Sequence, residues 1–234
     1  MYASSAMTPE RHLQWDGCAN VRDLGGLRTR DGGEIRPGAI VRADALDRLS
    51  ADGWAAVEAH GVRTVIDLRN DDELATDLAP RPSAITTLHL PLDGVEDTDF
   101  WQQWHERPEF GTPIYYRPFL DHFPERTAAV FTAIARAGPG GVAIHCGIGR
   151  DRTGLIAIML LALAGVGAEA IAADYALSED RVPFGLVGTF FEDNGTSAAE
   201  LITALLSGLD VEAYLRAAGV TGEDLAAIRA RVVN

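Results

Sequence analysis

The sequence predicts an α/β fold in a single domain, with a central, mostly parallel sheet flanked by helices. Candidate strands alternate with candidate helices along much of the chain, which is typical of a parallel sheet covered on both faces. The apolar run 141–144 leads into a glycine-bearing loop and then into a longer apolar run, 155–164. This order indicates a strand, a tight loop and a buried helix. With 234 residues, 47% of them hydrophobic, the chain suffices for one domain and is short for two.

The N-terminal half is predicted to hold short strands that are bounded by glycine turns or rich in β-branched residues. The turns lie at residues 24–27 and 31–34, and the strands at 39–42, 62–68 and 85–90, the last two being buried. Between these strands, Ser50 is a favourable N-cap for a helix that runs to His60, and Gly61 is placed to end it.

The C-terminal half is predicted to be mainly helical. Pro124 starts one helix, which ends at the glycine-rich residues 138–141 before the strand at 141–144. Four further helices are expected at residues 168–177, 197–206, 210–218 and 221–233, with Gly208 and Gly219 as stops. Residues 1–12 are expected to be disordered, so the predicted domain spans residues 13–234.

Composition and charge limit the partners and the compartment. The formal net charge of −14 argues against nucleic acid and against docking on anionic membranes, because both need a basic surface. The first residues show no secretory signal, and the apolar run near 155–166 is shorter than the roughly 20 residues that cross a bilayer. Two cysteines, Cys18 and Cys146, are too few for a disulfide framework. We therefore expect a cytoplasmic protein without an integral membrane segment.

The ten residues 145–154, HCGIGRDRTG, carry the functional signal. A loop that leaves a strand and enters a helix directs successive N–H groups into one concavity, where the helix N-terminus favours an anion. Gly147 and Gly149 allow backbone conformations and close approaches that a side chain would forbid. The loop is therefore predicted to bind a phosphate ion.

Three side chains of the loop add reactivity. Cys146 lies at the rim of the concavity, where a thiolate nucleophile is favoured. Arg152 offers a planar fork that can hold two phosphate oxygens. The Thr153 hydroxyl can donate a hydrogen bond to the cysteine sulfur and help it to leave.

The loop resembles the phosphate-binding loop of the cysteine-dependent protein tyrosine phosphatases, His-Cys-x-x-Gly-x-x-Arg-Ser/Thr-Gly, at every fixed position. Other stretches are similar to one branch of this superfamily, the bacterial tyrosine/serine phosphatases of the mycobacterial PtpB type. These stretches are NVRDLGG at 20–26, RPG at 36–38, VRADAL at 41–46, VIDLR at 65–69 and ADY at 173–175. The resemblance implies a phosphotyrosine-phosphatase-like fold and a reaction without metal or cofactor. It also implies that Gly147, Ile148, Gly149, Arg150, Asp151, Arg152 and Thr153 bind the substrate.

One loop position departs from that branch, which usually carries lysine where this chain has Arg150. The chain contains no lysine, and all 20 of its Lys and Arg positions are arginine. Arg150 keeps the positive charge but not the compact ammonium. A phosphoinositide preference that depends on the lysine therefore does not carry over with the resemblance.

A thiolate that attacks a phosphate ester needs an acid to protonate the leaving oxygen, which is worth roughly a hundred- to ten-thousandfold in rate. Asp93 follows a predicted strand and resembles the acid-loop aspartate of dual-specificity phosphatases. Asp151 lies inside the loop, and Asp67 ends another strand, so both are also candidates. Each has a non-catalytic alternative: Asp93 initiates a turn, Asp151 holds Arg152, and Asp67 pairs with Arg69.

Several further residues are candidates for supporting roles. His145 either braces the loop, which we favour, or tunes Cys146. Arg42 is expected in a buried polar scaffold together with Arg22, Asp23 and Arg69, or at the border of the phosphate pocket. Cys18 is expected to be a free thiol, with a disulfide to Cys146 as the alternative.

Eight aromatic residues lie between positions 100 and 123. They predict either a lid or a platform for a phosphotyrosine ring, or ordinary core packing. Residues 184–191 are a second candidate lid, because this stretch resembles the region where the PtpB-type branch places helices over its site.

The function predicted from these residues is removal of phosphate from phosphotyrosine, and also from phosphoserine or phosphothreonine, through a phosphocysteine intermediate. In this mechanism Cys146 is the nucleophile, Arg152 holds the phosphate, and Asp93 or Asp151 is the acid. The alternatives are a phosphoinositide phosphatase and a non-catalytic phosphate-binding module. The expected partners are a phosphorylated protein or a phosphoinositide, with no nucleic acid.

Overall fold

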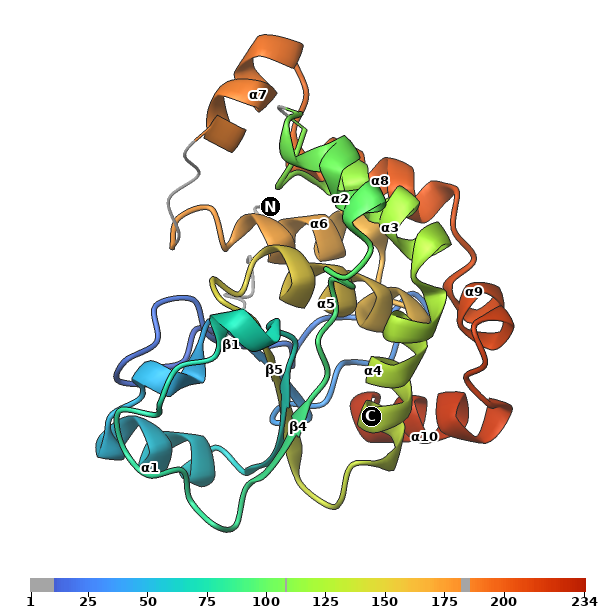
Figure 1. The fold of residues 1–234 in the computed structure, drawn as a ribbon. Coiled ribbons are helices and arrows are strands. Elements are labelled where there is room, and N and C mark those ends of the chain that lie inside the picture. The colour runs from blue at the N-terminus through green and yellow to red at the C-terminus, as the bar shows by residue number, and fades with distance from the viewer. Residues whose placement is uncertain (1–10, 108, 182–185) are drawn as a thin grey trace, which may run out of the picture.

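The computed structural model of the protein describes residues 11–107, 109–181 and 186–234 (Figure 1). Among these residues, one sheet has the strand order β1-β2-β5-β3-β4. Its strands are β1 (Arg22–Asp23), β2 (Ile40–Ala43), β3 (Val62–Asp67), β4 (Thr86–His89) and β5 (Gly141–His145). β1 pairs antiparallel with β2, and the other neighbours pair in parallel. The predicted α/β fold with a mostly parallel sheet is confirmed.

The described α-helices lie after β2, between β4 and β5, and after β5 along the chain. They are α1 (Ala51–Ala59), α2 (Thr98–His105), α3 (Tyr116–His122), α4 (Pro124–Arg136), α5 (Asp151–Leu163), α6 (Ala168–Ala176), α7 (Leu186–Asn194), α8 (Ala198–Ser207), α9 (Val211–Ala217) and α10 (Gly222–Val232). The predicted end signals of α1 are confirmed, since Ser50 accepts a hydrogen bond from the Gly53 N–H at 3.1 Å and Gly61 has φ +90°. Within the described residues, no helix combines the length and apolar character needed to cross a membrane.

The sheet separates two hydrophobic cores. Alternate residues of a strand point to opposite faces, so in β5 Ala143 belongs to one core while Val142 and Ile144 belong to the other. The smaller core contains Trp54 of α1, and the larger one contains residues of α4, α5 and α10. Figure 1 shows α1 on one side of the sheet and α4 on the other. The side chains of β5 are therefore packed between the two hydrophobic cores.

Two predictions of local structure were wrong. β4 was expected to be buried, but Thr86, Thr87 and His89 are exposed, because β4 pairs only with β3 in the sheet order and lies at its edge. The helix after the loop was expected from residue 155, but α5 already begins at Asp151, so the last residues of the loop motif form its first turn. Helices α2 and α3 were not predicted from the sequence.

Candidate active site

The loop at 146–150 connects β5 to α5, at the carboxyl end of a strand that lies between β2 and β3. Cys146 directly follows β5 and is 1% exposed. Gly149 has φ +71°, and a Cβ at this position would lie 2.6 Å from the carbonyl oxygen of Ala43. Glycine is therefore required here, because both the backbone conformation and the contact with β2 exclude a side chain.

Three consecutive carbonyls of the loop are bound from outside it. The Gly147 oxygen accepts from Ala45 N–H at 3.1 Å, and the Ile148 oxygen accepts from Asn20 Nδ2 at 2.9 Å. The Gly149 oxygen accepts from Arg42 Nη2 at 2.8 Å. In a trans peptide the N–H points opposite to the C=O, so the N–H groups of residues 148–150 face away from these donors. Together with the N-terminus of α5, these N–H groups are directed as in a site that binds an anion.

Two of these donors are held by a buried carboxylate, Asp174 of α6, which binds Arg42 directly and Asn20 by way of Arg22. Arg42 donates to Asp174 at 2.9 Å, and Arg22 donates to it at 3.2 Å. Arg22 also donates to the Asn20 side-chain oxygen at 2.9 Å, which orients the amide that binds the loop. The structure thus places Arg42 in the scaffold behind the loop, where its guanidinium binds a loop carbonyl.

Arg152, in the first turn of α5, is held by Glu73. Its Nη2 donates to one carboxylate oxygen of Glu73 at 2.6 Å, and its Nη1 donates to the other. Glu73 also accepts from the Asn70 N–H at 2.9 Å. Burial by itself raises the pKa of Glu73, but the hydrogen bonds from Arg152 and Asn70 outweigh it and lower the pKa. Glu73 is therefore an anion that fixes the guanidinium plane.

The ion pair with Glu73 leaves the Nε–Nη2 edge of the Arg152 guanidinium for a ligand. Within the described residues, Nε of Arg152 makes no hydrogen bond, while both Nη atoms are engaged. Sequence reasoning missed Glu73. The Asn70-to-Glu73 spacing of a helix capping box was the available signal, but it indicates a local turn and does not reveal the contact with Arg152.

Asp93 lies on the other side of the same guanidinium. One carboxylate oxygen of Asp93 lies 3.1 Å from Arg152 Nη1 and accepts from Asn70 Nδ2 at 2.9 Å. Its carbonyl accepts from the Trp101 indole N–H at 2.9 Å. Burial raises the pKa of Asp93, and the nearby carboxylates of Glu73 and Asp151 raise it further, against the lowering effect of Arg152 and Asn70. A carboxyl group with a raised pKa beside Arg152 is suited to proton transfer.

Asp151 and Arg150 form a pair of their own. Asp151 accepts from Arg150 Nε at 3.2 Å and from the Tyr175 hydroxyl at 3.4 Å. Arg150 is 5% exposed and also donates to the Gly111 carbonyl at 3.3 Å. The charge of Arg150 is thus partly balanced by its neighbour and lies inside the protein.

Asp67 and His145 are the last residues of the neighbouring strands β3 and β5, and they lie opposite each other in the sheet. Asp67 is 4% exposed and accepts from Arg69 at 2.8 and 3.0 Å. Burial by itself raises the pKa of Asp67, but the Arg69 hydrogen bonds and His145 outweigh it and lower the pKa. The structure places Asp67 in the ion pair with Arg69 that was the non-catalytic alternative.

His145 is fully buried, and its ring nitrogens lie 3.4 Å from the Cys146 carbonyl and 3.4 Å from the Asp67 carboxylate. Burial lowers the pKa of His145 to about 4, although Asp67 opposes this shift. The imidazole is therefore neutral at neutral pH and occupies a bracing position between β5 and β3.

The hydrogen bond expected from Thr153 to Cys146 is not formed. Thr153 is fully buried, and its hydroxyl has no hydrogen-bond partner among the described residues. Thr153 instead lies in the first turn of α5, among the buried residues of that helix. Cys18 is a free thiol whose sulfur lies 3.8 Å from the Ala45 carbonyl, and burial raises its pKa.

The aromatic stretch mainly packs into the core. Its buried members are Phe100, Trp101, Trp104, Tyr115, Tyr116, Phe119 and Phe123. Phe110 is 40% exposed and differs from them. The second candidate lid, 184–191, lies partly outside the described residues, and its later part belongs to α7.

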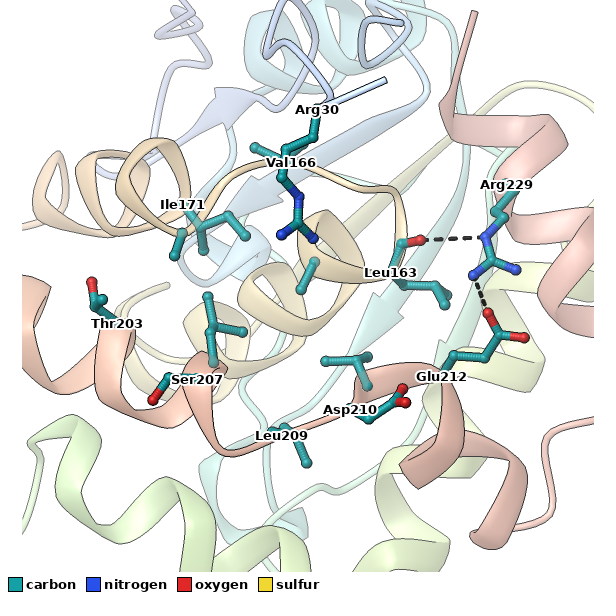
Figure 2. A pocket seen from close by; sticks show the side chains of 14 residues that line it. Arg30, Leu163, Val166, Ile171, Thr203, Ser207, Leu209, Asp210, Glu212 and Arg229 are labelled. Carbon is teal, nitrogen blue, oxygen red and sulfur yellow. Dashed lines mark hydrogen bonds and ion pairs between the residues drawn. The ribbon is translucent and has the colours of Figure 1, made fainter. Parts of the chain in front are cut away.

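A hollow of about 450 Å³ lies at the opposite end of α5 from the loop (Figure 2). Leu163, the last residue of α5, lines it, and Figure 2 shows Arg229 bound to the Leu163 carbonyl and to Glu212. It contains none of the loop residues and is not the candidate active site. Within the described residues, no group of three or more His, Cys, Asp or Glu side chains is placed to hold a metal ion.

Comparison with known proteins gives the following similarities. Residues 13–234 match a family model described as the tyrosine phosphatase family. The chain is 30% identical over 186 residues to a Cupriavidus necator protein provisionally named a tyrosine-protein phosphatase, covering 76% of this chain and 67% of that protein. It is 37% identical over 142 residues to a tyrosine-protein phosphatase of Nostoc commune, covering 60% of this chain and 48% of that protein. The chain therefore spans about half the length of the Nostoc relative.

Two more distant similarities were found. The chain is 29% identical over 196 residues to the triple specificity protein phosphatase PtpB of Mycobacterium tuberculosis, covering 71% of this chain and 69% of that protein. Among solved structures, TpbA of Pseudomonas aeruginosa in complex with phosphotyrosine matches with a TM-score of 0.39 and 19% identity. That match covers 81% of this chain and 91% of TpbA.

Proposed function

The chain belongs to the tyrosine phosphatase family, and we propose that it removes phosphate from phosphotyrosine by way of a phosphocysteine at Cys146. One observation carries this proposal: Cys146 precedes a loop whose carbonyls are bound from outside, with Arg152 held in place at the start of α5. A nucleophile, an anion concavity and a guanidinium fork thus lie within seven consecutive residues.

In the first step, the Cys146 thiolate attacks phosphorus, and the bond between phosphorus and the tyrosine oxygen breaks. The N–H groups of the loop and the Nε–Nη2 edge of Arg152 hold the three remaining oxygens as negative charge develops on them. The protonated Asp93 carboxyl gives its proton to the leaving oxygen. Tyrosine leaves with its hydroxyl restored, and the phosphate stays on sulfur.

In the second step, water attacks the phosphocysteine. The Asp93 carboxylate, now without its proton, takes one from the attacking water. The sulfur–phosphorus bond breaks, Cys146 leaves as a thiolate, and inorganic phosphate is released. Asp93 ends the cycle protonated, so the protons balance over the two steps.

Phosphoserine and phosphothreonine are the second substrate class. The triple specificity in the name of the Mycobacterium tuberculosis relative gives a reason to test them and phosphoinositides. Two observations weigh against phosphoinositides in this chain: the net charge of −14 and the pairing of buried Arg150 with Asp151. We also propose a reducing compartment, such as the cytoplasm, because the mechanism needs Cys146 as a free thiol.

Single-turnover assays test this proposal. Wild type and Cys146→Ser are mixed with a phosphotyrosine peptide, a phosphoserine peptide and a phosphoinositide, and the acid-quenched protein is examined for bound phosphate by mass spectrometry. We expect fast phosphotyrosine hydrolysis and a phosphorylated Cys146 in wild type, and neither in Cys146→Ser. Phosphate release that survives Cys146→Ser contradicts the covalent mechanism.

A further inference from the structure

Exposed apolar side chains gather around the candidate active site. The large apolar residues that are 40% or more exposed among the described residues are Leu74, Leu78, Val95, Phe110 and Ile148. Single exposed apolar residues are common on protein surfaces, whereas a group at one place marks an interaction site. Four of these five lie in segments that supply residues of the site.

Three of the four belong to the loop or lie within two positions of a residue of the site in the sequence. Ile148 belongs to the loop itself, and Leu74 directly follows Glu73, which binds Arg152. Val95 lies two residues after Asp93, which lies 3.1 Å from Arg152. Leu74, Val95, Phe110 and Ile148 are called the apolar rim below.

Phe110 is connected to the site by two routes. It precedes Gly111, whose carbonyl accepts from Arg150, and its ring centroid lies 6.3 Å from that of Trp101. Trp101 in turn donates to the Asp93 carbonyl at 2.9 Å. The apolar rim is therefore built from four separate segments that meet around the loop.

A hollow beside Val95 has the size of a side-chain pocket. It measures about 310 Å³, and Val95, Trp101 and His105 are among the residues that line it. Because Trp101 holds the backbone of Asp93, this hollow adjoins the acid. It can take one large apolar side chain of a chain segment whose phosphotyrosine enters the loop.

On its other side, Val95 borders a hollow of different chemistry. This hollow measures about 410 Å³ and is lined by Asn70, Asp71, Asp72, Glu96 and Arg126, among others. Arg126 is paired with Glu96 and does not balance the charges of Asp71 and Asp72. The lining of this hollow is therefore negatively charged. Such a surface attracts cationic groups and repels carboxylates and anionic headgroups.

Resting on the proposed function, we propose that the apolar rim binds the protein segment around the phosphotyrosine, and that it selects substrates with apolar and basic residues beside that tyrosine over substrates with acidic ones. The apolar rim supplies the affinity, and the carboxylates at Asp71 and Asp72 supply the charge preference. The same carboxylates oppose an anionic bilayer as the occupant, as does the net charge of −14.

Four phosphotyrosine peptides of equal length test this inference. Their flanking positions combine leucine or serine with arginine or glutamate, and p-nitrophenyl phosphate serves as a substrate without flanks. Dissociation constants are measured by calorimetry on Cys146→Ser, and kcat/KM on wild type. We expect the leucine peptides to bind on the order of tenfold more tightly than the serine peptides. The arginine peptides should bind about fivefold more tightly than the glutamate peptides at low salt, with less difference at high salt.

Paired variants assign the effects. Val95→Ser with Phe110→Ser should remove the leucine preference, and Asp71→Asn with Asp72→Asn should reduce the arginine preference, while p-nitrophenyl phosphate turnover stays within about twofold of wild type. Leu78→Ser is the matched control, because Leu78 is 73% exposed and its N–H donates to the carbonyl of Asp47, which is not a residue of the site.

The outcomes separate the two proposals. Equal binding of all four peptides, with intact p-nitrophenyl phosphate turnover, overturns the rim inference and leaves the proposed function standing. Selective peptide binding without any turnover supports the rim and contradicts the proposed function. Sedimentation with phosphatidylglycerol vesicles that is lost in the rim variants, with no effect on peptides, assigns the rim to a membrane and overturns the inference.

Discussion

The carboxylate of Asp93 lies 3.1 Å from Nη1 of Arg152. This contact joins the proposed acid to the proposed phosphate-binding guanidinium. Glu73 binds the same guanidinium, so two acidic side chains from different loops share one arginine. Glu73 has a lowered pKa and Asp93 a raised one, and pKa values pushed apart in this way are typical of carboxyl groups with different roles.

The first prediction concerns the identity of the acid. We expect Asp93→Asn to lower kcat for a phosphotyrosine peptide by roughly a hundred- to ten-thousandfold, because the amide cannot give its proton to the leaving oxygen. Steady-state kinetics check this, with Asp151→Asn as the matched control. An inactive Asp151→Asn beside an active Asp93→Asn moves the acid into the loop.

The second prediction concerns pH. The first step needs Asp93 protonated, so kcat/KM, which reports that step, should fall as pH rises through the pKa of Asp93. Burial raises that pKa, so the descending limb should lie above the ordinary aspartate value of about 3.9. A pH–rate profile of wild type and Asp93→Asn checks this, and the variant should lack the limb. A limb that persists in the variant belongs to another group.

The third prediction concerns Glu73. We expect Glu73→Gln to reduce kcat/KM by on the order of a hundredfold, because an amide cannot accept both guanidinium donors and Arg152 then departs from its productive orientation. With p-nitrophenyl phosphate as the substrate, Asp72→Asn is the control, because Asp72 is an exposed neighbour of Glu73, whereas Arg152 pairs with Glu73 and Asp93. Equal kinetics for wild type and Glu73→Gln exclude a positioning role.

The fourth prediction concerns stability. Asp174 is 1% exposed and binds both Arg22 and Arg42, which are also buried. Asp174→Asn leaves these cations uncompensated, so we expect the free energy of unfolding to fall by about 3–5 kcal/mol. Urea denaturation measures this, and Asp121→Asn, in an exposed pair with Arg117, should change the value by less than about 1 kcal/mol.

The charge of Asp174 also predicts how the free energy of unfolding depends on pH. Burial by itself raises the pKa of Asp174, but Arg22 and Arg42 outweigh it and hold the pKa well below the usual range. A lowered pKa in the folded state stabilises the protein above the unfolded pKa of about 3.9, and this stability is lost as pH falls further. The stability difference between wild type and Asp174→Asn should therefore shrink below about pH 4. A difference that is constant with pH contradicts the charge network as its cause.

Local patterns in the sequence were enough for most elements of the fold. Ser50 and Gly61 mark the ends of α1, and Pro124 marks the start of α4, because these residues act on the backbone beside them. The burial of β4 could not be predicted in this way. Its β-branched residues favour a strand, but only the strand order places β4 at the exposed edge of the sheet.

The sequence by itself determined the loop with the proposed nucleophile Cys146 and with Arg152, because both residues lie within one short segment whose local conformation depends on neighbours along the chain. Only the tertiary structure decided which distant groups meet them. Glu73, 79 residues from Arg152, follows β3, and Asp93 follows β4, and both reach Arg152 because parallel strands end at one edge of the sheet. Such contacts depend on strand order and register, to which no local pattern of residues corresponds.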